Sequence, residues 1–305
     1  MSGPVTTEDA SATVAALTAT SAPVLEITPS RAASVGGLSV RRALPRRGRR
    51  TVGAWCFLDH FGPTQARPSI GPHPHIGLQT VTWLLEGDVL HTDSLGSEQR
   101  IRPGQLNLMT AGRGVAHAEE GYSEGTPHGV QLWIAQPDAT RHATAAFEHH
   151  ERLPRVDVDG WRATVITGAF AGERSPARAD TPLVGIELTG GGAGGAVPLD
   201  PRFEHAIVVL AGEVAIEDQR VGPGALGYLG IGREWLRLDA RDETTVLLIG
   251  GEPFGAEVLM WWNYVARTRD EIDEAHRDWE AESDRFGQVA SRLPRIPSVP
   301  PIWQR

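Results

Sequence analysis

The chain has 305 residues, of which 40% are hydrophobic and 22% are charged, a composition typical of soluble globular proteins with one large domain or two. Its net charge of −9 argues against direct nucleic-acid binding, which depends on neutralising phosphates, so we expect no nucleic-acid partner. No apolar run reaches the roughly 18 residues of a membrane span, and we expect no membrane partner.

Both the N-terminus and the cysteine content bear on location. Residues 1–23 are rich in Ala, Ser and Thr and lack the basic start and apolar core of a signal peptide, so we expect a flexible tail. Cys56 is the only cysteine, which excludes an intrachain disulfide and favours a cytoplasmic location. Its neighbours Trp55 and Phe57 predict a buried, inert thiol.

From residue 24 onward, short β-like runs alternate with turns, as expected for a chain with 35 glycines and 22 prolines. The expected strands are 38–41, 55–58, 78–85, 106–109, 130–134, 163–167, 183–188, 206–210, 214–217 and 245–249. This regular spacing predicts an all-β fold built from sandwiches or barrels. We expect one barrel over residues 24–145 and a second over 146–262.

An internal duplication supports two barrels of the same design. Residues 83–89 (WLLEGDV) resemble 208–214 (VVLAGEV), and 101–106 (IRPGQL) resemble 221–226 (VGPGAL). Each pair contains the same succession of strand, glycine turn, strand and Pro-Gly turn. A repeated succession of this kind predicts that one structural unit is used twice.

Residues 263–305 differ from the rest and predict a C-terminal helix. Thr268 to Glu271 has the sequence of a capping box, which marks a helix start. Apolar residues follow at roughly helical spacing up to Phe286, and Gly287 is placed to end the helix. We expect this helix to pack on a barrel.

Three histidines and one glutamate form the most informative pattern in the sequence. His73 and His75 are separated by one residue, and so are His117 and Glu119. Residues i and i+2 of a strand point to the same face, so each pair can aim at one point from its own strand. Imidazole and carboxylate are common ligands of transition metals. The four residues are therefore candidate ligands of one metal ion.

The second copy lacks this pattern. Aligned on the repeated turns, it has Pro198, Asp200, Arg237 and Asp239 opposite the four candidate ligands. None of these is an imidazole. Any metal site is therefore expected in the first barrel alone.

Five segments closely resemble the pirin family, whose members are bicupins of the cupin superfamily. The segments are 71–75 (GPHPH), 83–87 (WLLEG), 110–114 (TAGRG), 117–119 (HAE) and 128–133 (HGVQLW). The resemblance extends, more weakly, over most of the chain after the tail. It implies two tandem cupin (jelly-roll-like) β-barrels followed by a C-terminal helix.

The resemblance also implies a ligand set and a metal. Pirins bind one metal ion in the N-terminal cupin, usually iron, and their ligands match His73, His75, His117 and Glu119. Four protein ligands that leave room for two more favour an octahedral ion. We expect Fe(II), with Mn, Ni, Co or Zn as alternatives.

Two functions follow from the resemblance, since some pirins are quercetin 2,3-dioxygenases and others are protein-binding regulators. As an enzyme, the chain would take a small aromatic, flavonol-like substrate and O₂, with Glu119 as both ligand and catalytic base. The alternative is a non-enzymatic, metal-containing regulatory module that senses redox state or a ligand and binds a protein partner. The sequence alone does not decide between the enzyme and the regulatory module.

Three more residues are candidates for a supporting role around the ligands. Many pirins have glutamate at the position of Gln79, so a carboxylate is missing there. His128 and Gln131 are expected either to line the pocket or to hydrogen-bond to the ligands, as residues around metal sites commonly do.

Other histidines and tryptophans are expected to be structural. Asp59 and His60 lie in a strand-to-turn segment and are expected to serve the fold. Histidines expected in surface loops are His91, His142, His149 and His150. Tryptophans expected to fill the core are Trp83, Trp133, Trp161 and Trp235.

Overall fold

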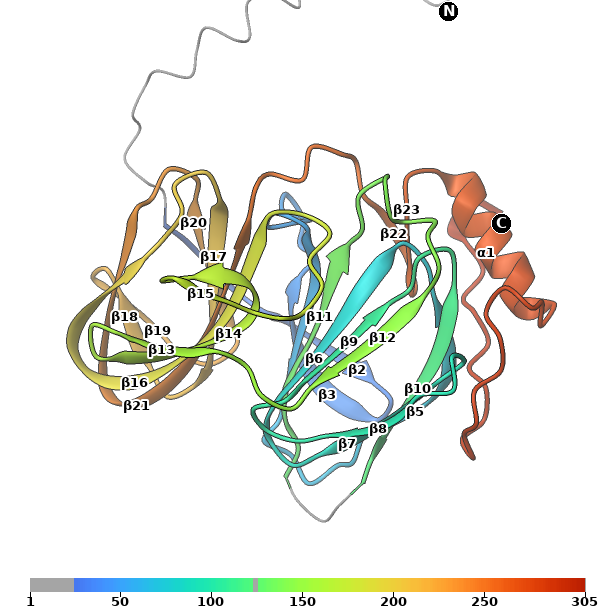
Figure 1. Ribbon diagram of the computed structural model, residues 1–305, viewed down its shortest axis with the longest axis horizontal. Coiled ribbons are helices and arrows are strands. Elements are labelled where there is room, and N and C mark those ends of the chain that lie inside the picture. The colour runs from blue at the N-terminus through green and yellow to red at the C-terminus, as the bar shows by residue number, and fades with distance from the viewer. Residues whose placement is uncertain (1–24, 123–125, 305) are drawn as a thin grey trace, which may run out of the picture.

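Two β-barrels lie side by side in the computed structural model, which describes residues 25–122 and 126–304 (Figure 1). The C-terminal helix α1 lies against the first barrel, on the side away from the second barrel. The all-β fold with one C-terminal helix is confirmed. The predicted tail, residues 1–23, lies outside the described residues.

The first barrel consists of a seven-stranded and a four-stranded antiparallel sheet. In spatial order the larger sheet contains β12 (Ala146–His150), β9 (Leu106–Thr110), β6 (Leu78–Glu86), β11 (His128–Ala135), β4 (Trp55–Phe61), β3 (Leu38–Leu44) and β2 (Arg31–Val35). The smaller sheet contains β5 (Ser69–His75), β10 (Val115–Gly121), β7 (Val89–Asp93) and β8 (Glu98–Ile101).

The second barrel is one ten-stranded sheet that curls on itself. Its main path contains β1 (Glu26–Pro29), β20 (Ala225–Gly230), β17 (Glu204–Ala211), β21 (Trp235–Gly251), β16 (Leu183–Pro198), β14 (Trp161–Phe170) and β13 (Arg155–Val158). Off this path lie β15 (Glu173–Arg174), β18 (Val214–Ile216) and β19 (Gln219–Val221). A separate hairpin of β22 (Leu259–Trp261) and β23 (Tyr264–Ala266) leads to α1 (Arg269–Glu280).

Strand pairing repeats between the two barrels, as the duplication predicts. In the first barrel β6 pairs with β9 and β11, and β10 pairs with β5 and β7. In the second, β17 pairs with β20 and β21, and β21 pairs with β16 and β18. The long strand β21 therefore takes the places of both β10 and β11.

A shared hydrophobic core joins the barrels through the outer face of the seven-stranded sheet. The buried Trp55 donates its indole N–H to the carbonyls of Val184 and Gly250, each 3.2 Å away in the second barrel. Trp83 donates its indole N–H to the Glu187 carboxylate at 2.7 Å. The inner face of the same sheet is left to line the interior of the first barrel.

Both ends of the described chain cross from one barrel to the other. Near the N-terminus, β1 pairs with β20 of the second barrel. After the second barrel, the β22–β23 hairpin returns to the first, where the Val265 N–H donates to the Ile76 carbonyl at 3.1 Å. The boundaries 24–145, 146–262 and 263–305 stay predictions.

The C-terminal helix starts as predicted and ends earlier. Thr268 caps it by accepting the backbone N–H of Glu271 at 3.3 Å. It ends at Glu280, not near Gly287, because Glu282 adopts a left-handed φ of +52° and closes a Schellman motif. Phe286 is buried beside the helix as expected for a core residue, but the prediction that it lies within the helix is wrong.

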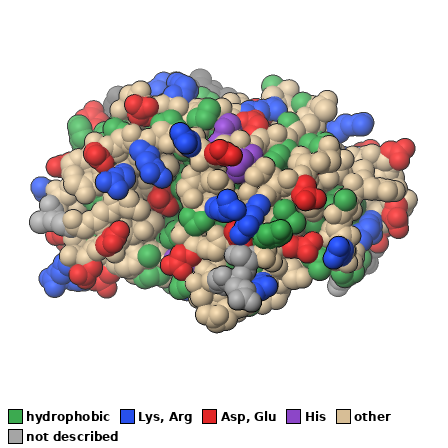
Figure 2. All heavy atoms as spheres, turned by 60° about the horizontal axis from the view of Figure 1, so that its bottom comes forward, with side chains coloured by type: hydrophobic (Ala, Val, Ile, Leu, Met, Phe, Trp, Pro, Cys, Tyr) green, Lys and Arg blue, Asp and Glu red, His purple; other side chains and the backbone are tan. Residues whose placement is uncertain are grey.

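No helix in the described part of the chain is long and apolar enough to cross a membrane. On the face in Figure 2, acidic and basic side chains are interspersed, with no large patch of one sign.

Cys56 is buried, and burial raises the pKa of its thiol to about 12, which fits the expected inert thiol.

A buried histidine pair predicts acid sensitivity of the fold. The Nε2 atoms of His60 and His128 lie 2.9 Å apart, and burial lowers the pKa of His60 to about 3. Unfolding restores an ordinary pKa near 6.5, so the unfolded state binds more protons below that pH. We expect the free energy of unfolding to fall by up to about 1.4 kcal/mol per pH unit on account of His60 between roughly pH 6 and 4.

Urea unfolding at pH 7, 6 and 5 measures this dependence. The variant His60→Gln should show a shallower loss of stability on acidification than the wild type. The matched control His142→Gln changes an exposed histidine and should keep the wild-type slope. Equal slopes in all three proteins would contradict the assignment to His60.

Candidate metal centre

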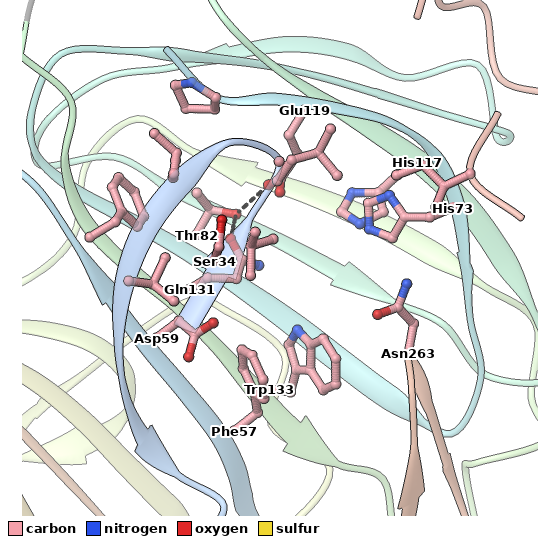
Figure 3. Close-up of a pocket in the computed structure, with 18 of the residues that line it drawn as sticks. Ser34, Phe57, Asp59, His73, Thr82, His117, Glu119, Gln131, Trp133 and Asn263 are labelled. Atoms are coloured by element: carbon pink, nitrogen blue, oxygen red, sulfur yellow. Dashed lines mark hydrogen bonds between the residues drawn. The ribbon is translucent and has the colours of Figure 1, made fainter. Parts of the chain in front are cut away.

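A cavity of about 440 Å³ occupies the first barrel between its two sheets (Figure 3). It is lined by side chains from β3, β4, β6 and β11 on one side and from β5, β7 and β10 on the other. Asn263, from the turn between β22 and β23, also lines it. The volume falls in the range typical of small-molecule sites.

Strands β5 and β10 bring three candidate ligands together at the wall of this cavity. His73 and His117 are direct cross-strand neighbours, and His75 follows two residues after His73. All three side chains are buried, and their nearest ring nitrogens lie within 4.8 Å of one another. The i, i+2 spacing therefore directs the imidazoles to one point, as expected for residues on one face of a strand.

Hydrogen bonds fix the tautomers of His73 and His75. The Nδ1 atom of His73 lies 2.9 Å from the Gly71 carbonyl, and that of His75 lies 3.0 Å from the Asn263 carbonyl. A carbonyl only accepts, so both Nδ1 atoms carry the proton. Each Nε2 is then left with a lone pair.

A chain of three residues fixes His117 in the same way. His91 Nε2 lies 3.1 Å from an Asp93 carboxylate oxygen, so Nε2 donates, and in the neutral ring His91 Nδ1 accepts. Burial favours a raised pKa for Asp93, but hydrogen bonds from His91 and the Ser97 amide bring it below its ordinary value. His117 Nδ1 lies 3.3 Å from His91 Nδ1 and donates to it when the His91 ring is neutral. The Nε2 of His117 therefore also has a free lone pair.

These tautomers place two lone pairs face to face. The Nε2 atoms of His75 and His117 are 3.0 Å apart. Burial lowers the pKa of His73 to about 4, and burial likewise lowers the pKa values of His75 and His117 well below 6.5, which disfavours a proton between the rings. Two nitrogens each about 2.1 Å from one ion and at right angles lie about 3.0 Å apart. The donor set therefore fits a metal ion.

Glu119 lies in a second group that shares His117. Donor atoms of His91, His117 and Glu119 lie within 4.8 Å of one another, whereas Glu119 does not meet that spacing with all three ligand imidazoles. Burial raises the pKa of Glu119, and the Thr82 hydroxyl donates to its carboxylate at 3.3 Å. His117 thus connects the three imidazoles to the only carboxylate among the candidate ligands.

The prediction that His91 is a surface or loop residue is wrong. It is 2% exposed, because it lies on β7 directly opposite Glu119 of β10 and so points into the barrel. Its ring also stacks on Phe147, with centroids 4.5 Å apart. In the sequence, the i, i+2 spacing of His91 and Asp93 is the feature that could have indicated two polar side chains on one inward strand face.

The supporting residues lie in three different places. Gln131 lines the cavity, and its side-chain amide lies 3.0 Å from the Thr82 hydroxyl oxygen. Gln79 lies on the opposite face of β6 from Thr82 and donates to Thr110 at 2.9 Å. His128 is paired with His60 and is not among the cavity-lining residues.

Of the tryptophans, Trp83, Trp133 and Trp161 are buried as expected, and Trp133 also lines the cavity. Trp133 stacks on Phe57 with ring centroids 4.1 Å apart and planes 16° from parallel. Trp235 is 60% exposed, so its prediction as a core residue is wrong.

Among its described residues, the second barrel has no equivalent site. Neither β16 nor β21 contains a histidine. Arg237 and Asp239, aligned with His117 and Glu119, are exposed, whereas Leu236 and Leu238 are buried in the core. The alignment is therefore one residue out of phase along this strand, which exchanges inward and outward positions. Because side chains alternate along a strand and Leu236 faces inward, Trp235 faces outward.

Family comparison supports the same division into two units. Residues 37–134 match the pirin family model, and residues 186–287 match the model of the pirin C-terminal cupin domain.

Individual relatives are similar over nearly the whole chain. A Pseudomonas aeruginosa protein provisionally named quercetin 2,3-dioxygenase is 46% identical over 92% of this chain and 92% of its own length. Human pirin is 31% identical over 88% of this chain and 95% of its own. A crystal structure of quercetin 2,3-dioxygenase from Acinetobacter baumannii superposes with a TM-score of 0.86 and 42% identity, over 90% of this chain and 96% of that one.

Proposed function

The chain belongs to the pirin family, and on that premise we propose that it is a metal-dependent dioxygenase of the quercetin 2,3-dioxygenase type. The observation that carries the proposal is the convergence of three imidazole lone pairs at the wall of a cavity of about 440 Å³. The names of the relatives from Pseudomonas and Acinetobacter support the flavonol as substrate and O₂ as co-substrate.

His73, His75, His117 and Glu119 would hold one transition-metal ion, for which Fe(II) is our first choice and Mn, Ni, Co or Zn are alternatives. Such an ion supplies Lewis acidity and exchangeable positions for oxygen donors. The hydrogen bonds from His73 and His75 to backbone carbonyls hold both rings in the ligating tautomer before any ion arrives.

Glu119 would take the proton from the flavonol 3-hydroxyl, and its position in the cavity wall beside the imidazoles supports this role. The Thr82 hydroxyl orients it from the side of the seven-stranded sheet. The stacked rings of Phe57 and Trp133 offer a flat apolar wall to an aromatic substrate and keep water away from it.

Oxygen uptake tests the proposal directly. The protein is loaded anaerobically with Fe(II), Mn(II), Ni(II), Co(II) or Zn(II) in turn and then given quercetin in aerated buffer. We expect uptake of one O₂ per quercetin consumed with at least one redox-active metal. No uptake with any metal would contradict the enzyme and favour the regulatory module. A cytoplasmic location, favoured by the single buried thiol, remains a proposal.

A further inference from the structure

A row of four polar side chains crosses the inner face of the seven-stranded sheet. Arg42 of β3 is paired in register with Asp59 of β4, Asp59 with Gln131 of β11, and Gln131 with Thr82 of β6. All four line the cavity. Directly cross-strand residues point to the same side of a sheet, so the row forms a continuous polar strip on the cavity wall.

Asp59 lies in the cavity away from His73 and His117 (Figure 3). It is 3% exposed, and Arg42 holds both of its oxygens, through Nε at 2.8 Å and Nη2 at 2.7 Å. Each carboxylate oxygen keeps a further lone pair. Asp59 is therefore a fixed acceptor, ready to receive a hydroxyl group from a ligand.

Gln131 offers a polar group between Asp59 and Thr82. One end of its amide lies 3.0 Å from the Thr82 hydroxyl, while the other end is buried and has no hydrogen-bond partner among the described residues. A buried polar atom without a partner is costly. A hydroxyl group of a bound ligand, which can both donate and accept, would satisfy it.

The strip sets the length and shape of the ligand. Thr82, which contacts Glu119, lies two strands from Asp59, or about 10 Å at the usual strand spacing. The stacked pair of Phe57 and Trp133 occupies the next register position along β4 and β11. A flat aromatic molecule of several rings can lie along this wall and reach both ends, whereas a single ring is too short.

We propose that Asp59, held by Arg42, is a specificity-determining residue that selects aromatic ligands bearing a phenolic hydroxyl at the end remote from the imidazoles, and that it disfavours ligands with an anionic group there. The inference rests on the proposed function only in taking a flavonol as the ligand. It makes no use of turnover.

Calorimetric titration without O₂ tests the proposal with three flavonols. Quercetin carries hydroxyls on both outer rings, 3-hydroxyflavone keeps only the 3-hydroxyl, and 4′-carboxy-3-hydroxyflavone replaces an outer hydroxyl by an anion. We expect the wild type to bind quercetin at least about tenfold more tightly than 3-hydroxyflavone, because a site built for a hydroxyl rejects the analogue that lacks it.

The variant Asp59→Asn keeps the shape and removes the charge. It should reduce the preference for quercetin over 3-hydroxyflavone to within about twofold and bind the carboxylated flavonol more tightly than the wild type does, because Arg42 loses its counter-ion. Simple loss of structure would weaken all three ligands together. The matched control Asp180→Asn removes another arginine-paired aspartate, outside the cavity, and should leave all three affinities unchanged.

A wild-type preference below about threefold, or an unchanged preference in folded Asp59→Asn, would overturn the proposal. The wild-type ratio decides the matter even where the variant does not fold. Failure of all three flavonols to bind would overturn both the proposal and the flavonol assignment. A tenfold preference without any O₂ uptake would overturn the dioxygenase alone.

Discussion

Replacing His117 with alanine is expected to lower the bound transition metal from about one equivalent to less than a tenth of one. His117 is the only residue common to both donor groups, and its Nε2 lies 3.0 Å from that of His75. Its loss leaves two imidazoles, and Glu119 loses the ligand that links it to them. Elemental analysis after anaerobic reconstitution and desalting measures the effect, and flavonol-dependent O₂ uptake should fall to background with it.

His91→Gln provides the comparison that separates a ligand from its support. It removes the acceptor that fixes the His117 tautomer and leaves the three imidazoles in place. Changes of this kind typically weaken metal binding by about 10- to 100-fold without abolishing it. Full metal content in His117→Ala would show that the assigned ligand set is wrong. Equal losses of bound metal in both variants would instead indicate that His91 is itself a ligand.

The sequence was sufficient to predict the convergence of the imidazoles because their pattern is local. His73 and His75 share one strand face by spacing alone, and the family resemblance placed His117 opposite them. His91 was missed because its role depends on the pairing of β7 with β10, which no local pattern encodes. Asp59 was expected to be structural for the same reason, since its neighbours in the polar strip come from three other strands.

The sequence predicted least well which side of a strand each residue faces and where the C-terminal helix ends. Trp235 and its neighbours on β21 were placed one residue out of phase, because the repeated turns fix the order of strands more firmly than the side each residue faces. The C-terminal helix was predicted too long because Glu282, not a glycine, takes the left-handed position that ends it. The pairing of β1 with β20 is equally non-local.

Replacing Trp55 with alanine is expected to have the largest effect on stability. The side chain is 1% exposed and belongs to the hydrophobic core shared by both barrels. Large-to-small substitutions of buried aromatic residues typically cost about 3–5 kcal/mol. The two hydrogen bonds to Val184 and Gly250 are lost as well, so we expect a loss at the upper end of that range. Urea unfolding followed by circular dichroism measures it.

Trp55→Phe is the matched control, since it keeps a six-membered aromatic ring and removes the indole donor together with the five-membered ring. It should cost about 1–2 kcal/mol, because the Val184 and Gly250 carbonyls lose a donor that water does not easily replace. A loss below about 1 kcal/mol in Trp55→Ala would contradict a core that couples the two barrels.

Trp55→Ala also tests whether the two faces of the seven-stranded sheet act independently. Trp133 pairs with Phe57 and Ile134 with Trp55, so Cys56 is the extra residue of a β-bulge. The bulge turns Trp55 toward the second barrel and Phe57 toward the cavity, although only one residue separates them. Trp55→Ala should therefore keep its metal content and flavonol affinity at low denaturant while its unfolding midpoint falls. Parallel loss of metal and stability would show that the cavity depends on the docked second barrel.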